Sequence, residues 1–275
     1  MGSNGDIVPP VLKGSTAQDQ PWTVEGVVAA LPGGPPQTDS ESPVPFFHMI
    51  ERLKTTKREG WRRFGIETYE SIPPGGALLT VSSGESIADH MYRMSLITMC
   101  APASLTAKLD IPRCTRMALI HDVAEALVGD ITPVDGVPKP EKNRRESTTM
   151  DYLTGPGGLL GKFNGGLNGK EIKAIWQEYE DGVTEESKFV HDVDKIELVL
   201  QMVEYERMGH GKYDLGEFSW VASRIEMPEV KAWADEVLQE RATFWAELGE
   251  KKAGLEKPEE GLVKQQNEYY GNGKA

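Results

Sequence analysis

Apolar residues recur at intervals of three and four over most of this chain, and that spacing limits the folds open to it. The longest stripes lie in 185–208 and 229–248. The other stretches with this spacing are 86–100, 112–127, 141–153 and 170–181. No segment shows a convincing alternation of apolar and polar residues, which a half-buried strand would need. The pattern therefore predicts an all-α protein built as a helical bundle.

The two ends of the chain differ in composition from its centre. Residues 1–45 hold eight of the 18 prolines and six glycines and offer little to fill a core, so we expect a disordered leader. Residues 250–275 are polar and lack a sustained period, which indicates a flexible tail. The body between them, 46–249, has the size of one ordinary domain. Within it, 65–84 and the glycine-rich 155–169 are predicted loops.

The charge of the chain excludes one class of function. The net charge of −13, from 43 acids against 30 bases, speaks against a general nucleic-acid binder, which needs a basic face. No apolar run approaches the ~18–20 residues of a membrane helix. The leader also lacks the basic and then apolar segments of a signal peptide. We therefore expect no nucleic-acid polymer and no membrane as partner, and a location in the cytoplasm or the nucleus.

Histidine is scarce, with five in the chain, and two of the five stand among acids. His121 is followed by Asp122, and Glu125 lies about one turn further along the same predicted helix, so these three can approach one site. His90 lies on the preceding predicted helix and Asp194 on a later one. Three helices can thus bring His90, His121, Asp122 and Asp194 to one point in the core of a bundle.

A buried group of histidines and carboxylates is costly without compensating charge, which a divalent cation supplies. Mixed imidazole and carboxylate ligands suit Mn, Fe, Co, Ni or Zn better than Ca. The alternative is a buried histidine bonded to an aspartate, an arrangement common in protein cores. A second pair, His191-Asp192, has Lys195 rather than an acid three residues after its aspartate, and we expect His191 at the surface. The spaced set around His121 is more specific than either pair and favours a metal centre.

Five longer motifs carry a resemblance to a known family. They are REGW at 58–61, ESIADHMYRM at 85–94, ALIHDVAEALVGDITP at 118–133, EKNRRE at 141–146 and FVHDVDKIELVLQMVEYE at 189–206. Together they resemble the HD-domain phosphohydrolases, and within these the 5′-deoxynucleotidases. The likeness runs from about residue 46 to about residue 220. It implies an all-helical HD fold and metal-dependent removal of phosphate from deoxynucleoside 5′-monophosphates.

The resemblance also implies roles for individual residues around a cofactor of one or two divalent cations, Mn, Co or Mg. The principal metal ligands would be His90, His121, Asp122 and Asp194. Glu125, which shares the catalytic role with Asp122, corresponds to the residue assigned to water activation or to a second metal. Asp130 and the backbone carbonyl of Ile131 correspond to the remaining contacts of that second metal.

The substrate contacts implied by the resemblance are Arg58, Trp61, Asp130 and Thr132. Arg58 could bind phosphate through its planar fork of donors. Trp61 could stack on the base or sugar and exclude a ribose 2′-hydroxyl, or it could be a core tryptophan. Asp130 could instead be a turn residue at a helix end. The segment between Trp61 and Glu85 is longer than the usual link in the family.

The EKNRRE motif adds three cations, Lys142, Arg144 and Arg145. They could attract the phosphate, or they could form a solvated helix face. The resemblance further implies a homodimer. Three alternative functions stay open at this point: an HD-type phosphodiesterase, a nucleoside triphosphate hydrolase, and a non-catalytic nucleotide-sensing module.

Overall fold

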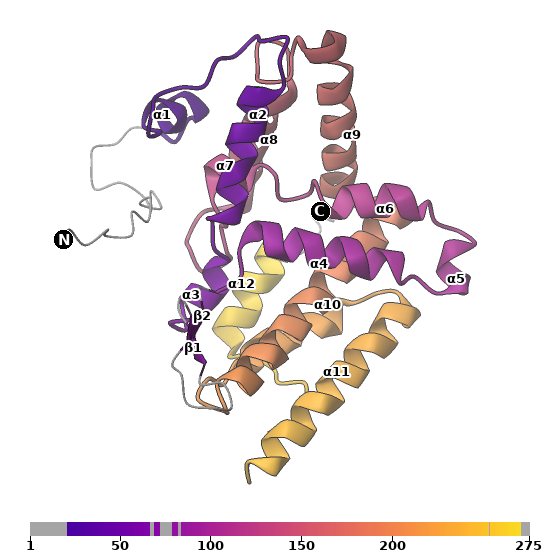
Figure 1. Cartoon of the computed structure of the whole chain (residues 1–275). Helices are drawn as coiled ribbons and strands as arrows, with labels where there is room; N and C mark the ends of the chain where they lie inside the picture. Colours follow the sequence, from indigo (N-terminus) through magenta and orange to yellow (C-terminus); the bar gives the residue numbers. More distant parts are fainter. Residues whose placement is uncertain (1–20, 67–68, 72–78, 82–83, 253, 271–275) are drawn as a thin grey trace, which may run out of the picture.

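The structure is a computed structural model that describes residues 21–66, 69–71, 79–81, 84–252 and 254–270. In these ranges the chain forms a bundle of helices with one short hairpin, which confirms the predicted fold class (Figure 1). The elements, with 3₁₀ helices written η, are α1 (Val24–Ala29), α2 (Val44–Ile50), η1 (Glu51–Lys54), α3 (Glu59–Arg62), β1 (Tyr69–Ser71), β2 (Leu79–Val81), α4 (Ile87–Met99), α5 (Ala103–Thr106), α6 (Ile111–Ala118), α7 (Glu125–Val128), α8 (Lys139–Thr154), η2 (Phe163–Gly166), α9 (Leu167–Asp181), α10 (Glu185–Met208), η3 (Gly216–Arg224), α11 (Pro228–Glu247) and α12 (Glu260–Tyr270). Among the described residues, no helix has both the length and the apolar character needed to cross a membrane.

Helix α10 is the centre of the bundle. It contacts α4, α6, α9, α11 and η3. Phe189, Val193 and Val199 on α10 are fully buried, because their apolar stripe faces several neighbours at once. They belong to the larger of two apolar clusters, which also includes Met94 of α4 and Met117 of α6. The predicted helices over 185–208 and 229–248 are confirmed as α10 and α11.

Helix α4 begins with a capping box, which fixes the start of the helix that carries His90. Ser86 Oγ accepts the Asp89 backbone N–H at 3.1 Å, and the Asp89 carboxylate accepts the Ser86 backbone N–H at 3.0 Å. A bridge between Lys57 and Ser86 ties the segment before α3 to this helix start. His90 follows one turn later and is fully buried.

The prediction of a continuous helix over 112–127 is wrong. Helix α6 ends at Ala118 and α7 begins at Glu125, with turns over 119–124 between them. In this stretch the Glu125 backbone N–H bonds the Asp122 carbonyl, three residues back, at 3.0 Å. Turns of three residues place side chains three apart on the same side. In this break, the side chains of Asp122 and Glu125 therefore lie on the same side of the backbone.

The prediction of a disordered leader over 1–45 is wrong for residues 21–45. This part contains α1, whose Val24 and Val28 are buried in the second apolar cluster together with residues of α7 and α8. Two valines four residues apart can anchor a short helix to the core, but they are too few for the apolar spacing to reveal the helix in the sequence. Residues 1–20 lie outside the described residues.

The tail predicted to be flexible also packs against the domain in its described part, 250–252 and 254–270. Arg241 of α11 is fully buried and pairs with the equally buried Glu206 at 2.8 Å. The same guanidinium donates to Glu256 Oε1 of the tail at 2.9 Å. Because a buried guanidinium needs its donors satisfied, this pairing holds the tail on α11.

The predicted loop over 65–84 contains the hairpin. Strand β1 pairs with β2 in antiparallel register, with Tyr69 opposite Val81 and Ser71 opposite Leu79. Strands of three residues are too short for alternation to reveal them. Residues 67–68, 72–78 and 82–83 of this segment lie outside the described residues.

Candidate functional site

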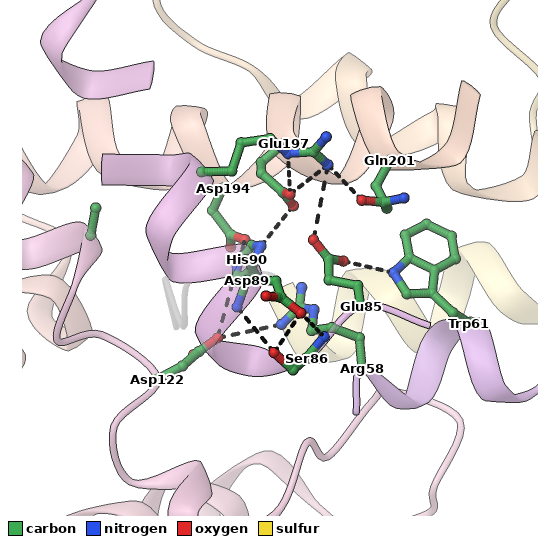
Figure 2. Close-up of polar contacts among 12 residues, drawn as sticks. Arg58, Trp61, Glu85, Ser86, Asp89, His90, Asp122, Asp194, Glu197 and Gln201 are labelled. Atoms are coloured by element: carbon green, nitrogen blue, oxygen red, sulfur yellow. Dashed lines mark hydrogen bonds and ion pairs between the residues drawn. The ribbon is translucent and has the colours of Figure 1, made fainter. Parts of the chain in front are cut away.

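Four side chains from three parts of the bundle meet at its centre. His90 comes from α4, Asp194 from α10, and His121 and Asp122 from the turns between α6 and α7. His90 Nε2 lies 3.2 Å from Asp194 Oδ1 and 3.9 Å from Asp122 Oδ2. His121 Nε2 lies 3.1 Å from Asp122 Oδ2. The structure thus brings together the four predicted metal ligands, three of which are labelled in Figure 2.

The two histidines present nitrogen atoms that suit a metal ion. His90 Nδ1 lies 2.6 Å from Glu197 Oε2, and His121 Nδ1 lies 3.0 Å from the Ala118 carbonyl oxygen. In both rings Nε2 is buried and makes no hydrogen bond to any residue that the structure describes. His90, His121 and Asp194 each offer a ligand atom, and these atoms lie within 4.8 Å of one another. This donor set is typical of a divalent transition metal, so the residues fit the predicted cation.

The charges of the cluster are consistent with such an ion. Burial would raise the pKa of Asp122 and of Asp194, but His121 holds the pKa of Asp122, and His90 that of Asp194, well below the ordinary value. Both are therefore carboxylates, the form that binds metal. Burial is the main cause that raises the pKa of Glu125 well above its ordinary value, and the negative charge of the nearby Asp122 raises it further. An added cation would stabilise all three as carboxylates.

Arg58 brings a positive charge to these carboxylates. Its Nη1 donates to Asp122 Oδ2 at 3.3 Å (Figure 2). Burial would lower the pKa of Arg58, but Asp130, Asp122 and Asp194 raise it well above its ordinary value. The long segment between α3 and α4 therefore does not carry Arg58 away from the cluster. A guanidinium in this place can bind a phosphate oxyanion with two parallel donors.

Glu125 and Asp130 lie at the two ends of α7. Glu125 is 2% exposed, and its Oε2 has no hydrogen-bond partner in the described part of the chain. Gly129 follows α7 with φ 77°, a value that glycine adopts without strain. After this turn Asp130 Oδ2 accepts the Glu59 backbone N–H at 2.7 Å. Asp130 therefore joins the segment after α7 to the first residue of α3, and it is close enough to Glu125 to raise that group's pKa. Ile131 next to it is buried.

Comparison with known proteins identifies the family. The family model described as HD domain matches residues 76–233. The chain belongs to the HD domain family. It is 45% identical over 214 residues to the 5′-deoxynucleotidase hdd1 of Schizosaccharomyces pombe, over 78% of this chain and 97% of that protein. It is 35% identical over 201 residues to the human 5′-deoxynucleotidase HDDC2, over 72% of this chain and 85% of that protein. Among solved structures, HD domain-containing protein YGK1 superposes with a TM-score of 0.53 at 28% identity, over 81% of this chain and 94% of that one.

Trp61 occupies the core position that the sequence kept open as an alternative. Its side chain is 1% exposed, and its ring packs against Tyr205 and Phe218 at centroid distances of 5.3 and 4.7 Å. Its Nε1 donates to Glu85 Oε2 at 2.9 Å, and Figure 2 shows the indole on the far side of Glu85 from His90. No exposed face of Trp61 is left to stack on a base or sugar.

Thr132 lies in the segment that follows Ile131. Its backbone N–H and its Oγ1 both donate to Asp135 Oδ2, at 2.8 and 2.7 Å. These bonds close a local turn of the kind that aspartate commonly stabilises. The structure thus places Thr132 in an ordered turn directly after Asp130 and Ile131, and a contact with substrate stays a prediction.

The three cations of the EKNRRE motif separate into two groups on α8. Arg144 and Arg145 pair with Glu141, at 2.7 and 2.8 Å, and form the solvated face that the sequence kept as an alternative. Lys142 instead pairs with Glu146, which is 5% exposed, at 3.3 Å. Its positive charge also opposes the rise in the pKa of Glu125 that burial causes.

Glu197 is a site residue of the HD domain that the sequence did not single out. It is fully buried on α10, accepts from Arg93 Nε at 2.8 Å and binds His90 Nδ1. A carboxylate on the second nitrogen orients a ligating imidazole and raises its basicity. Glu197 follows Asp194 by three residues, so its place on the same helix face was a usable signal.

Tyr179 of α9 is a second residue that the sequence missed. Its hydroxyl donates to Asp194 Oδ2 at 3.2 Å, and its ring lies 4.8 Å from the His121 ring between centroids. On its other side it contacts His191, at 4.0 Å between centroids. His191 is therefore partly covered, contrary to the surface position expected for it. Nothing in the sequence revealed these contacts, which depend on how α9 packs on α10.

Proposed function

We propose that this chain is a metal-dependent 5′-deoxynucleotidase, which hydrolyses deoxyribonucleoside 5′-monophosphates to the deoxynucleoside and phosphate. The observation that carries the proposal is that the buried Nε2 atoms of His90 and His121 face the carboxylates of Asp194 and Asp122 without making a hydrogen bond among the described residues. The similarity to 5′-deoxynucleotidases of fission yeast and human supports the choice of substrate.

The residues of the cluster suit one divalent cation or two, and we propose Mn, Co or Mg. The ligands of the first would be His90, His121, Asp122 and Asp194. A second would be held by Glu125, Asp130 and the Ile131 carbonyl. When bound, such a cation offsets the charge of the phosphate and lowers the pKa of a water molecule.

Side chains of this protein bind the phosphate and transfer the proton during hydrolysis. Arg58 binds phosphate oxygens and holds the phosphorus toward the cluster. Glu125, whose buried Oε2 is unpartnered, takes a proton from the attacking water. The water oxygen forms its bond to phosphorus as the bond to the sugar O5′ breaks in line, and the departing oxygen takes a proton from solvent. Thr132 contributes to the surface that receives the nucleotide.

A phosphate-release assay tests this function against its alternatives. The protein is loaded with Co, Mn or Mg and offered dAMP, AMP, a phosphodiester and dATP. We expect release from dAMP, with AMP a poorer substrate. Hydrolysis of the diester or of dATP alone would favour a phosphodiesterase or a triphosphate hydrolase. No release from any substrate with any metal would contradict the proposal and favour a nucleotide-sensing module.

Lys142 is expected to assist phosphate binding, whereas Arg144 is not. We predict that Lys142→Met raises KM for dAMP about tenfold, the size expected for one lost charge-assisted hydrogen bond, with a smaller change in kcat. Arg144→Met is the matched control, because Arg144 lies on the same helix and pairs with Glu141. Steady-state kinetics of both variants check this. Equal KM values for the two variants would place Lys142 outside the substrate site.

We also propose that the protein forms a homodimer, as the resemblance implies. Tyr92, Leu96 and Met99 of α4 are exposed by 63%, 43% and 60%, at helical spacing, and a second copy would cover this apolar row. Light scattering should give twice the mass of one chain, and Leu96→Glu should give a single chain. A monomeric wild-type protein would contradict this prediction. A cytoplasmic or nuclear location is likewise proposed, and microscopy of a tagged chain tests it.

A further inference from the structure

Glu85 stands between two parts of the site without belonging to either. It precedes the N-cap Ser86 of α4 and is 8% exposed. It is not among the predicted ligands or substrate contacts. A buried carboxylate that served no partner would cost several kcal/mol, so the contacts of Glu85 indicate what it does.

On one side, Glu85 holds the segment that carries Arg58. The Arg58 backbone N–H donates to the Glu85 carbonyl oxygen at 3.0 Å, and Trp61 Nε1 donates to Glu85 Oε2 at 2.9 Å. The Ile87 backbone N–H donates to the Thr56 carbonyl at 3.0 Å in the same stretch. The turn of α3 and the start of α4 are therefore clipped together, with the guanidinium of Arg58 extended toward Asp122 (Figure 2).

On the other side, Glu85 lies close to Arg93 and Glu197, the residues that hold His90 in place. Its Oε1 lies 3.9 Å from Arg93 Nη2, and the same Nη2 lies 2.7 Å from Glu197 Oε1. Glu197 in turn binds His90 Nδ1. Glu85, His90 and Glu197 each have a polar atom within 4.8 Å of the others, and all three are buried. The two carboxyl groups thus share the cation of Arg93 directly behind the imidazole.

We propose that Glu85 is a positioning residue that joins the Arg58 segment to His90 through Trp61 on one side and Arg93 and Glu197 on the other. The inference rests on the proposed metal site and phosphate-binding Arg58. Its consequence is that one side chain sets both the affinity for metal and the affinity for phosphate, although it touches neither.

The test compares Glu85→Ala with two matched variants of the full-length protein. Glu85→Gln keeps an oxygen for Trp61 Nε1 and presents an amide N–H to Glu197. Glu204→Gln alters the exposed partner of the same Arg93. Isothermal titration and the visible spectrum of bound Co(II) report on the metal site, and KM for dAMP reports on Arg58.

We expect Glu85→Ala to weaken Co(II) binding about tenfold, to change the Co(II) spectrum and to raise KM, because losing an outer-shell partner typically has an effect of this size. Glu85→Gln should restore all three, and Glu204→Gln should change none. Wild-type Co(II) affinity and spectrum in Glu85→Ala would overturn the proposal, as would an equal loss in Glu204→Gln.

Two further outcomes keep the inference separate from folding and from the proposed function. If Glu85→Ala does not fold, Trp61→Phe keeps an aromatic ring but removes the indole N–H that bonds Glu85, and it should raise KM at unchanged Co(II) affinity. An unchanged KM in Trp61→Phe would overturn the link to Arg58. If the protein hydrolyses no deoxynucleotide, the proposed function fails, while the Co(II) measurements still decide the link between Glu85 and His90.

Discussion

Asp122→Ala is expected to abolish deoxynucleotidase activity and metal retention while leaving the helices intact. Asp122 is the residue on which the cluster converges, since His90 Nε2, His121 Nε2 and Arg58 Nη1 all lie within 3.9 Å of its Oδ2. Removing it takes a ligand from the metal and leaves Arg58 without its carboxylate. A loss of about 4 kcal/mol in transition-state stabilisation corresponds to about a thousandfold in kcat/KM.

The measurement combines kinetics, metal analysis and circular dichroism of the purified variant. Asp235→Ala is a suitable control, because Asp235 is an exposed acid on α11 that pairs only locally with Lys231 and its loss changes the net charge equally. Retained turnover or retained metal in Asp122→Ala would count against the assigned centre. Loss of helicity would show instead that the variant does not fold.

Glu125→Gln is expected to lower kcat by about two to three orders of magnitude, the usual contribution of a general base. Gln has the same shape but cannot take a proton from water. Because Glu125 is not one of the four principal ligands, one Co(II) per chain should remain bound and KM for dAMP should change little. The buried and unpartnered Oε2 is the structural reason for expecting a role of this kind.

Burst kinetics and metal stoichiometry of Glu125→Gln separate the two roles that Glu125 can have, which are general base and ligand of a second metal. A variant that loses one of two bound ions together with its activity would identify Glu125 as a ligand of a second metal. A variant with wild-type kcat would remove Glu125 from the chemistry altogether.

The helices that could be predicted are those whose apolar residues repeat over several turns. Helices α10 and α11 are of this kind, and so is α4, whose start is marked by Ser86 and Asp89 of its capping box. The break between α6 and α7 could not be predicted, because the apolar spacing continues through 119–124 while the backbone changes to three-residue turns. The packing of α1 depends on two valines and on contacts with α7 and α8, which lie far from α1 in the sequence.

The candidate site shows the same division between local and long-range information. His121, Asp122 and Glu125 are close in sequence, and helical spacing with a family resemblance was enough to join them to His90 and Asp194. The family resemblance was enough to predict a site role for Arg58, although the segment that separates it from α4 is longer than the usual link in the family. The contacts of Tyr179 and Glu85 involve partners more than ten residues away, and only the packed bundle reveals them.

The acidity of the chain leads to the most direct test of this account. Asp122, Glu125, Asp130 and Asp194 contribute to the net charge of −13, and all four are close enough to Arg58 to raise its pKa. They therefore surround a site proposed for a phosphate. Without a cation, the charged carboxylates of Asp122 and Asp194 should repel the nucleotide, and Arg58 is already engaged by Asp122.

The decisive measurement is phosphate release from dAMP by protein stripped of metal with a chelator, followed as Co(II) or Mn(II) is added back. We expect background rates without metal, recovery that saturates at one or two ions per chain, and no dAMP binding by calorimetry before metal is added. Phosphate release by the metal-free protein at the rate of the reloaded protein would contradict this expectation.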